Sequence, residues 1–126
     1  MSDRRYLVRP SELAPYAHAN HTGTKNLRLI APEMVGARHV EVLLGELEQV
    51  RGALAHAHPG IEQVCYLLEG EAQVEVDGER FEMRPGEACF FPAGSFHVFR
   101  AASPRAKVLV IYAPPYGEDP AKVVRK

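Results

Sequence analysis

Residues that favour turns divide the middle of this chain into short apolar segments, and this spacing limits the folds open to it. Glycine and proline each occur ten times in 126 residues. The breaks fall at Pro32-Glu33, Arg51-Gly52, Pro59-Gly60, Glu69-Gly70, Pro85-Gly86, Pro92-Ala93-Gly94 and Ser103-Pro104. Segments of this length suit strands better than helices, so the pattern predicts an all-β chain.

The clearest segment is a hairpin. Residues Glu71–Val76 alternate polar and apolar, Asp77-Gly78 tolerates positive φ, and Phe81 and Met83 resume an apolar face. Further strands are predicted at Asn26–Ile30, Arg38–Val50, Leu54–His58, Glu62–Leu68, Ala88–Phe91, His97–Ala101 and Lys107–Tyr112. Eight or nine short strands leave no room for the crossover helices of βαβ units, so we expect an all-β sandwich or barrel.

Composition excludes several classes of protein. The 15 Lys and Arg nearly cancel the 16 Asp and Glu, and no segment concentrates basic residues, so we expect no nucleic-acid partner. The longest apolar run, Val108–Ala113, is far below the roughly 18 residues that cross a membrane. A charged N-terminal start and only two cysteines favour a cytoplasmic protein. We expect one domain, with a core at 38–112, an extension at 1–25 and a tail at 114–126.

Three histidines carry the strongest functional signal. His56 and His58 are two residues apart on a predicted strand, so both imidazoles share one face and can reach a common point about 2.0–2.1 Å from each ring. Such a pair alone is more often a coincidence than a metal site. His97 follows the turn at Pro92-Ala93-Gly94 and begins the next strand, where it can meet the first pair. Together the two stretches predict a metal site.

The second stretch resembles a sequence motif of the cupin superfamily, whose members are small jelly-roll β-barrels. That motif reads Gly, five residues, Pro-x-Gly, two residues, His, three residues, Asn. It fits here at Gly86, Pro92, Gly94 and His97, and it departs at Ala101, where the motif has Asn.

The first cupin motif fits at His56, His58 and Gly70, although Gly52 lies closer to His56 than the pattern requires. The resemblance covers about Arg38 to Tyr112. It implies a jelly-roll barrel, also called a double-stranded β-helix, that holds a divalent transition metal and binds a small molecule inside.

The resemblance also implies a third ligand on the strand after the histidine pair. Glu62 has the required spacing from His58, whereas the spacing counted back from Gly70 gives Gln63. Adjacent strand residues point to opposite faces, so a regular strand offers only one of them. We favour Gln63, because the strand fixes the register better than the turn before it, with Glu62 as the alternative. The expected metal ligands are His56, His58, Gln63 and His97.

Four protein ligands leave two open positions on an octahedral metal, for substrate, O₂ or water. An amide leaves the metal a full dication, a stronger Lewis acid than with a carboxylate ligand. Imidazole-rich sites do not select among Mn, Fe, Co, Ni, Cu and Zn. The resemblance implies an enzyme acting on a small oxygen-bearing molecule, of dioxygenase, isomerase, lyase or decarboxylase type. A sensor or storage protein that binds without turnover is the alternative.

Other residues give weaker signals. His39 and Glu41 would share a strand face as a general acid/base pair, or simply as a solvated face. Cys65 shares the face of Gln63, and we expect it and Cys89 to be reduced core thiols.

The segment Val108–Tyr112 is apolar on both faces and therefore needs cover on each. We expect a homodimer, in which a second copy covers one face of the sheet.

Overall fold

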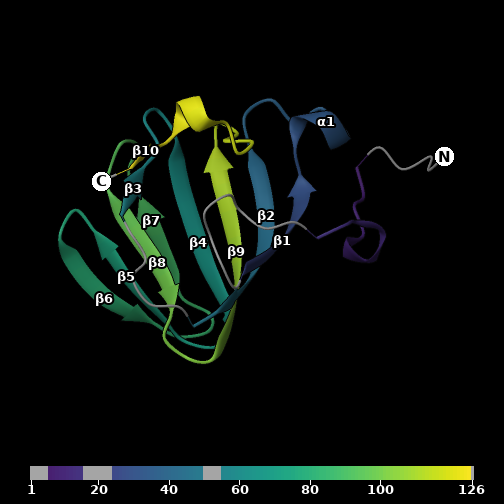
Figure 1. Cartoon of the computed structure of the whole chain (residues 1–126). Coiled ribbons are helices and arrows are strands. Elements are labelled where there is room, and N and C mark those ends of the chain that lie inside the picture. Colours follow the sequence, from purple (N-terminus) through teal and green to yellow (C-terminus); the bar gives the residue numbers. More distant parts are fainter. Residues whose placement is uncertain (1–5, 16–23, 50–54, 126) are drawn as a thin grey trace.

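The structure, a computed structural model, describes residues 6–15, 24–49 and 55–125. Two five-stranded sheets face each other in it (Figure 1). The first sheet has the order β1 (Thr24–Ile30), β2 (Glu41–Glu48), β9 (Arg105–Ala113), β4 (Glu62–Glu69) and β7 (Ala88–Phe91). The second has the order β10 (Val124–Arg125), β3 (His56–Ala57), β8 (His97–Ala101), β5 (Ala72–Val76) and β6 (Glu79–Met83). This antiparallel arrangement confirms the predicted all-β jelly roll.

Among the residues that the structure describes, helical structure is limited to short turns that begin at proline. These are η1 (Pro10–Glu12), α1 (Pro32–Val35) and η2 (Pro120–Lys122). Proline suits the first helical position because the missing N–H has no partner there in any helix. No helix within the described ranges is long and apolar enough to cross a membrane.

The predicted hairpin forms in the predicted register. Val76 pairs with Glu79 across Asp77 and Gly78, whose φ angles are 47° and 86°. Two positive φ values in a two-residue loop match the twist of the flanking strands. Local turn chemistry therefore fixes this element.

The predicted strand at Arg38–Val50 is wrong at its start. The strand β2 begins at Glu41, because the chain leaves α1 through Gly36, at φ 74°, and bends at His39 before it extends. Val50 and Leu54, which end and begin predicted strands, lie outside the described residues.

Strand register aligns the inward side chains of the first sheet into rows. The first row, across β2, β9, β4 and β7, contains Glu41, Tyr112, Gln63 and Phe91. The second row, two residues further along each strand, contains Leu43, Val110, Cys65 and Cys89. The main apolar core contains Phe91 of the first row and Cys65 and Cys89 of the second row, and it continues away from the first row. The first row therefore lies at one end of the barrel, where polar side chains enter the interior.

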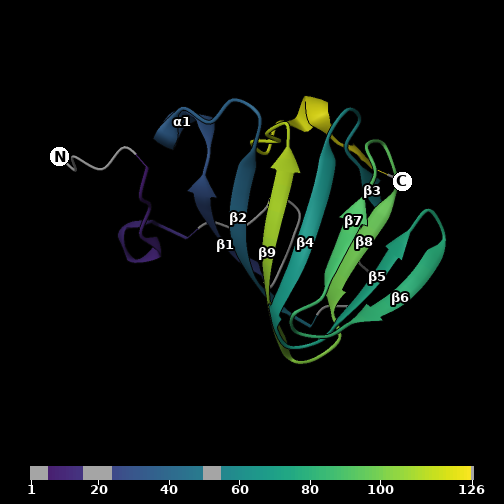
Figure 2. The same ribbon diagram turned by 180° about the vertical axis from the view of Figure 1, so that it is seen from behind.

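The C-terminal segment, residues 114–125, crosses the end of the sandwich nearest the first row (Figures 1 and 2). Glu41 Oε1 accepts hydrogen bonds from the backbone N–H of Tyr116 and of Gly117, at 3.1 and 3.0 Å. The strand β10 then pairs with β3, Val124 opposite Ala57 and Arg125 opposite His56. This segment therefore adds the last strand to the second sheet.

Candidate metal centre

Three histidines of the second sheet come together at this end of the barrel. His56 lies directly opposite His97 in the β3–β8 pair, and His58 follows the end of β3. One ring nitrogen from each histidine lies within 4.8 Å of the other two. Small rotations of the rings are enough to place these nitrogens around one first-row metal ion.

Backbone carbonyls fix the tautomers of two of these rings. His58 Nδ1 lies 2.9 Å from the carbonyl oxygen of Lys122, and His97 Nδ1 lies 3.2 Å from that of Ser95. A carbonyl can only accept, so each Nδ1 carries the proton and each Nε2 keeps its lone pair. Metal-binding histidines are held in this way in many proteins.

Burial keeps His97 neutral. The His58 and His97 side chains are 2% and 3% exposed. Desolvation, followed by the neighbouring His58, lowers the pKa of His97 to about 4. The ring is therefore uncharged at neutral pH, which is the state that binds a metal.

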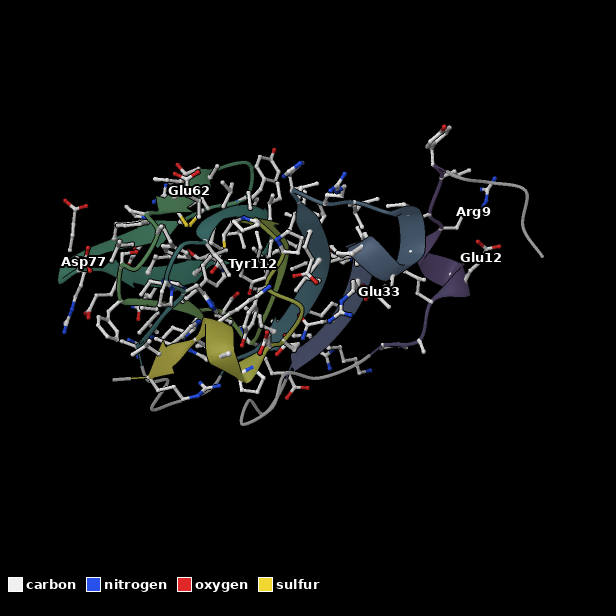
Figure 3. The ribbon with its side chains drawn as sticks, turned by 90° about the horizontal axis from the view of Figure 1, so that it is seen from above. Arg9, Glu12, Glu33, Glu62, Asp77 and Tyr112 are labelled. Carbon is white, nitrogen blue, oxygen red and sulfur yellow. The ribbon has the colours of Figure 1, made fainter. Side chains whose placement is uncertain are left out.

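Gln63 enters the same space from the opposite sheet. It is 6% exposed, and its first-row neighbours Phe91 and Tyr112 both contact histidine rings. Its Nε2 donates to Cys65 Sγ at 3.5 Å, while no described residue hydrogen-bonds its buried Oε1. Glu62 points outward and is exposed (Figure 3). Of the two alternatives, Gln63 alone therefore faces the interior.

Aromatic rings surround the histidine cluster. Phe91 stacks on His97 with ring centroids 4.0 Å apart and planes 3° from parallel. Tyr116 and Tyr112 lie 4.3 and 5.5 Å from the ring of His58. Burial raises the pKa of Tyr112 well above its ordinary value, so its phenol stays protonated. The walls combine apolar rings with a neutral hydrogen-bonding group.

The structure does not bring His39 and Glu41 together. His39 is exposed in the bend before β2, so the predicted shared strand face is wrong. Glu41 is buried, with Oε1 on two backbone N–H groups and Oε2 3.2 Å from Arg28 Nε. Its carboxylate holds the C-terminal segment in place.

Sequence reasoning missed the contribution of the C-terminal segment. The contact uses the backbone carbonyl of Lys122, which any residue would provide, so the type of side chain at this position does not predict the contact. Tyr116 follows Pro114-Pro115 in a segment with no periodicity to suggest its position.

Both cysteines are free and buried, as predicted. Cys65 and Cys89 lie opposite each other across β4 and β7. The neighbouring Cys89 thiol, together with burial, raises the pKa of Cys65 well above its ordinary value.

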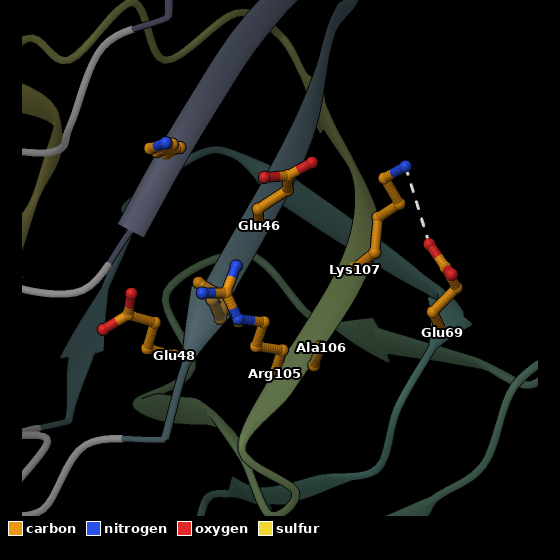
Figure 4. Close-up of a pocket in the computed structure, with 8 residues that line it drawn as sticks. Glu46, Glu48, Glu69, Arg105, Ala106 and Lys107 are labelled. Carbon is orange, nitrogen blue, oxygen red and sulfur yellow. Dashed lines mark ion pairs between the residues drawn. The ribbon is translucent and has the colours of Figure 1, made fainter.

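A hollow of about 360 Å³ lies at the end of β2 and β9 away from the histidine cluster (Figure 4). Its charged residues are Lys25, Arg105, Lys107, Glu46, Glu48 and Glu69. The three cations balance the three carboxylates, and Lys107 pairs with Glu69 at 3.5 Å. This surface therefore offers no net charge to a ligand, and no histidine lines it.

Comparison with known proteins agrees with the arrangement of strands. The sequence model of the cupin domain matches residues 43–112. The chain belongs to the cupin family. This match confirms the family suggested by the two sequence motifs.

Relatives of this cupin include enzymes. Polyketide synthase CurC from Streptomyces cyaneus is 28% identical over 93 residues, which are 74% of this chain and 60% of CurC. The structure of KdgF from Halomonas sp. superposes with a TM-score of 0.77 at 18% identity, over 90% of this chain and 96% of KdgF. The structure of the polyketide cyclase RemF from Streptomyces resistomycificus superposes with a TM-score of 0.71 at 24% identity, over 90% of this chain and 80% of RemF.

The two structural likenesses show the shared fold. This cupin spans between 57% and 60% of the length of the curated relatives that it matches.

Proposed function

We propose that this cupin binds one divalent transition metal through His56, His58, His97 and Gln63 and acts on a small oxygen-bearing molecule. The observation that carries the proposal is the set of three clustered imidazoles, two of them held by carbonyls so that Nε2 keeps its lone pair. The buried Oε1 of Gln63, which no described residue hydrogen-bonds, supports an amide as the fourth ligand. Glu62 faces the other side of the strand and is not proposed as a ligand.

The donor set suits Lewis-acid chemistry. When bound, a dication with only neutral ligands would polarise a carbonyl group or acidify a bound water molecule. The aromatic rings of Phe91 and Tyr116 keep water away from the site. The resulting low dielectric constant strengthens electrostatic interactions there. Tyr112, kept protonated by burial, can donate a hydrogen bond to an oxygen atom of the bound molecule.

We propose a non-oxidative reaction next to a carbonyl group, as in a cyclase, isomerase or decarboxylase. CurC and RemF are named for polyketides, whose alternating carbonyl groups present two oxygens to a metal with two open positions. Oxygenation of the dioxygenase type is the competing reaction for the same ligands.

Metal content tests the first part of the proposal. We expect about one metal ion per chain in protein purified without chelators, and loss of that metal in His58→Ala and His97→Ala. His39→Ala is the matched control, because His39 is an exposed histidine outside the cluster. Elemental analysis measures all four proteins. A wild-type protein without metal, or a His58→Ala variant with the wild-type content, would refute the site.

Turnover tests the second part. Metal-loaded protein is incubated with a panel of small β-dicarbonyl compounds, and products are followed by chromatography. We expect product formation that disappears in His97→Ala. Tight binding across the panel without any product would instead favour the sensor or storage alternative.

We further propose a cytoplasmic homodimer formed through the outer face of the first sheet. Two adjacent rows of this face are apolar, and they include Tyr66 and Phe90, which are 39% and 48% exposed. The next row alternates in charge, with Lys25, Glu46 and Lys107 paired in register. A row of alternating charges beside an apolar patch can pair with the same row on a second copy of the chain. Two free cysteines suit a reducing compartment.

A further inference from the structure

A pair of thiols lies directly below the proposed metal ligand Gln63. Cys65 and Cys89 are register partners in the second row, one row further into the barrel than Gln63. They are 1% and 9% exposed, and each thiol shifts the pKa of the other. Neither thiol is a proposed metal ligand.

The strand pairing places the two cysteines within reach of a disulfide. On the same ladder, Leu67 N donates to Glu87 O at 3.0 Å. Hydrogen-bonded positions alternate along an antiparallel pair, so Cys65 and Cys89, two residues away, also occupy one. Cα atoms at such a position are about 5.5 Å apart, inside the range of disulfides at about 4.4–6.8 Å. The Cβ atoms lie farther apart than a relaxed disulfide prefers, so the bond would be strained and easily reduced.

The thiol pair is connected to the metal centre through one side chain. Gln63 Nε2 donates to Cys65 Sγ at 3.5 Å, and this contact orients the amide. Forming a disulfide would bring the two sulfur atoms to about 2.0 Å, which draws Cys65 Sγ toward Cys89 and away from Nε2. The buried amide would then lose its partner and the orientation that presents Oε1.

We propose that Cys65 and Cys89 form a reversible disulfide that weakens metal binding through Gln63. With hydrogen peroxide as the oxidant, the two thiols lose two protons and two electrons, one S–S bond forms, and the peroxide is reduced to two water molecules. A low-molecular-weight dithiol reverses the reaction by thiol–disulfide exchange and becomes a disulfide itself. The coupling to the metal rests on the proposed function, whereas the disulfide does not.

The disulfide is tested in the full-length, metal-free protein. The folded protein is treated with hydrogen peroxide, then denatured, alkylated and digested for mass spectrometry. We expect a peptide pair joined through Cys65 and Cys89 within one chain, no alkylation at either residue, and recovery of both thiols after dithiothreitol. Cys89→Ser and Cys89→Ala serve as controls that retain Cys65 but cannot form the bond. Full alkylation of both cysteines, or oxidation to sulfinic acid without a cross-link, would overturn the proposal.

The coupling is tested by measuring the Kd of Mn²⁺ for reduced and oxidised protein by titration calorimetry. We expect affinity about 10- to 100-fold weaker after oxidation, the range found when a contact that orients a ligand is lost. Peroxide should leave the affinity of Cys89→Ala unchanged. Equal affinities with the disulfide confirmed would overturn the coupling but leave the metal site intact. A reduced protein that binds no metal would overturn the coupling together with the proposed function, while mass spectrometry would still decide the disulfide.

Discussion

Gln63 and Glu62 are neighbours in sequence, but the strand points them to opposite sides of the sheet. The amide of the inward residue, Gln63, is a weaker metal ligand than the carboxylate of the outward residue, Glu62. Position rather than side-chain chemistry therefore decides which of them can reach the histidines.

We predict that Gln63→Ala weakens metal binding by at least about tenfold, because it removes a ligand atom. Glu62→Ala, which changes an exposed side chain, is the matched control and should bind with wild-type affinity. Titration calorimetry with one metal gives both values. The opposite result, with only Glu62→Ala affected, would mean that the strand shifts its register on binding metal.

Acid should destabilise the metal-free protein through His97. Its pKa falls from an ordinary 6.5 to about 4 in the folded state. Between these two values the unfolded chain binds a proton at this residue and the folded chain does not. The free energy of unfolding therefore falls as the pH is lowered from 6.5 to 4, by on the order of 3 kcal/mol for the full shift.

The measurement is the Tm of metal-free wild type and His97→Gln across this pH range. We expect a flatter pH dependence in the variant, because glutamine does not titrate. Parallel curves would show that folding does not lower the pKa of His97.

At this scale, side-chain chemistry and spacing were enough to predict the three histidines and to prefer Gln63. They could not predict that Glu41 would be engaged by two backbone N–H groups and Arg28. Those partners are distant from Glu41 in the sequence, and no local sequence pattern predicts these contacts.

Among the elements, the short C-terminal segment supports two of the three histidines of the site. The backbone carbonyl of its residue Lys122 accepts a hydrogen bond from His58 Nδ1–H, and its strand β10 pairs with β3, which carries His56. Short strands of two residues have little stability of their own. The segment and the site therefore stabilise each other.

We predict that deleting residues 119–126 weakens metal binding by about 10- to 100-fold, because His58 loses the carbonyl that fixes its tautomer. Lys122→Ala is the control: it removes the side chain but keeps the carbonyl, so its affinity should match that of the wild type. Metal titrations compare the three proteins. Unchanged affinity in the truncated chain would show that His58 is oriented without this segment.

Elements set by local chemistry were predictable, and elements set by distant contacts were not. The β5–β6 hairpin follows from alternation and from Asp77-Gly78. The strand β3 is only two residues long because its partners, His97 and the C-terminal strand, define its ends.

For the whole molecule, the proposed dimer depends on the outer face of the first sheet. We predict that Phe90→Glu converts the proposed dimer to a monomer, because it places a charge within an apolar interface. Arg80→Glu, on the exposed hairpin strand β6, is the control for a change in charge and should remain dimeric. Sedimentation velocity gives the mass of each. A wild-type protein that sediments as a monomer at micromolar concentration would rule out the dimer.

The jelly-roll fold as a whole was predictable because two motifs, separated by a hairpin, place their turns and histidines at fixed spacings. The pairing of the C-terminal strand β10 with β3 was not, because it depends on tertiary packing.

The contact between His58 and Lys122 spans 64 residues of the sequence. Closing a loop of that length costs chain entropy before any contact in the site can form, so such pairings form late in folding. We therefore expect the proposed metal centre to be absent from the early folding nucleus. Interactions that form after the transition state act on the unfolding rate and leave the folding rate unchanged. A bound metal should accordingly extend the lifetime of the folded protein without making the protein fold faster.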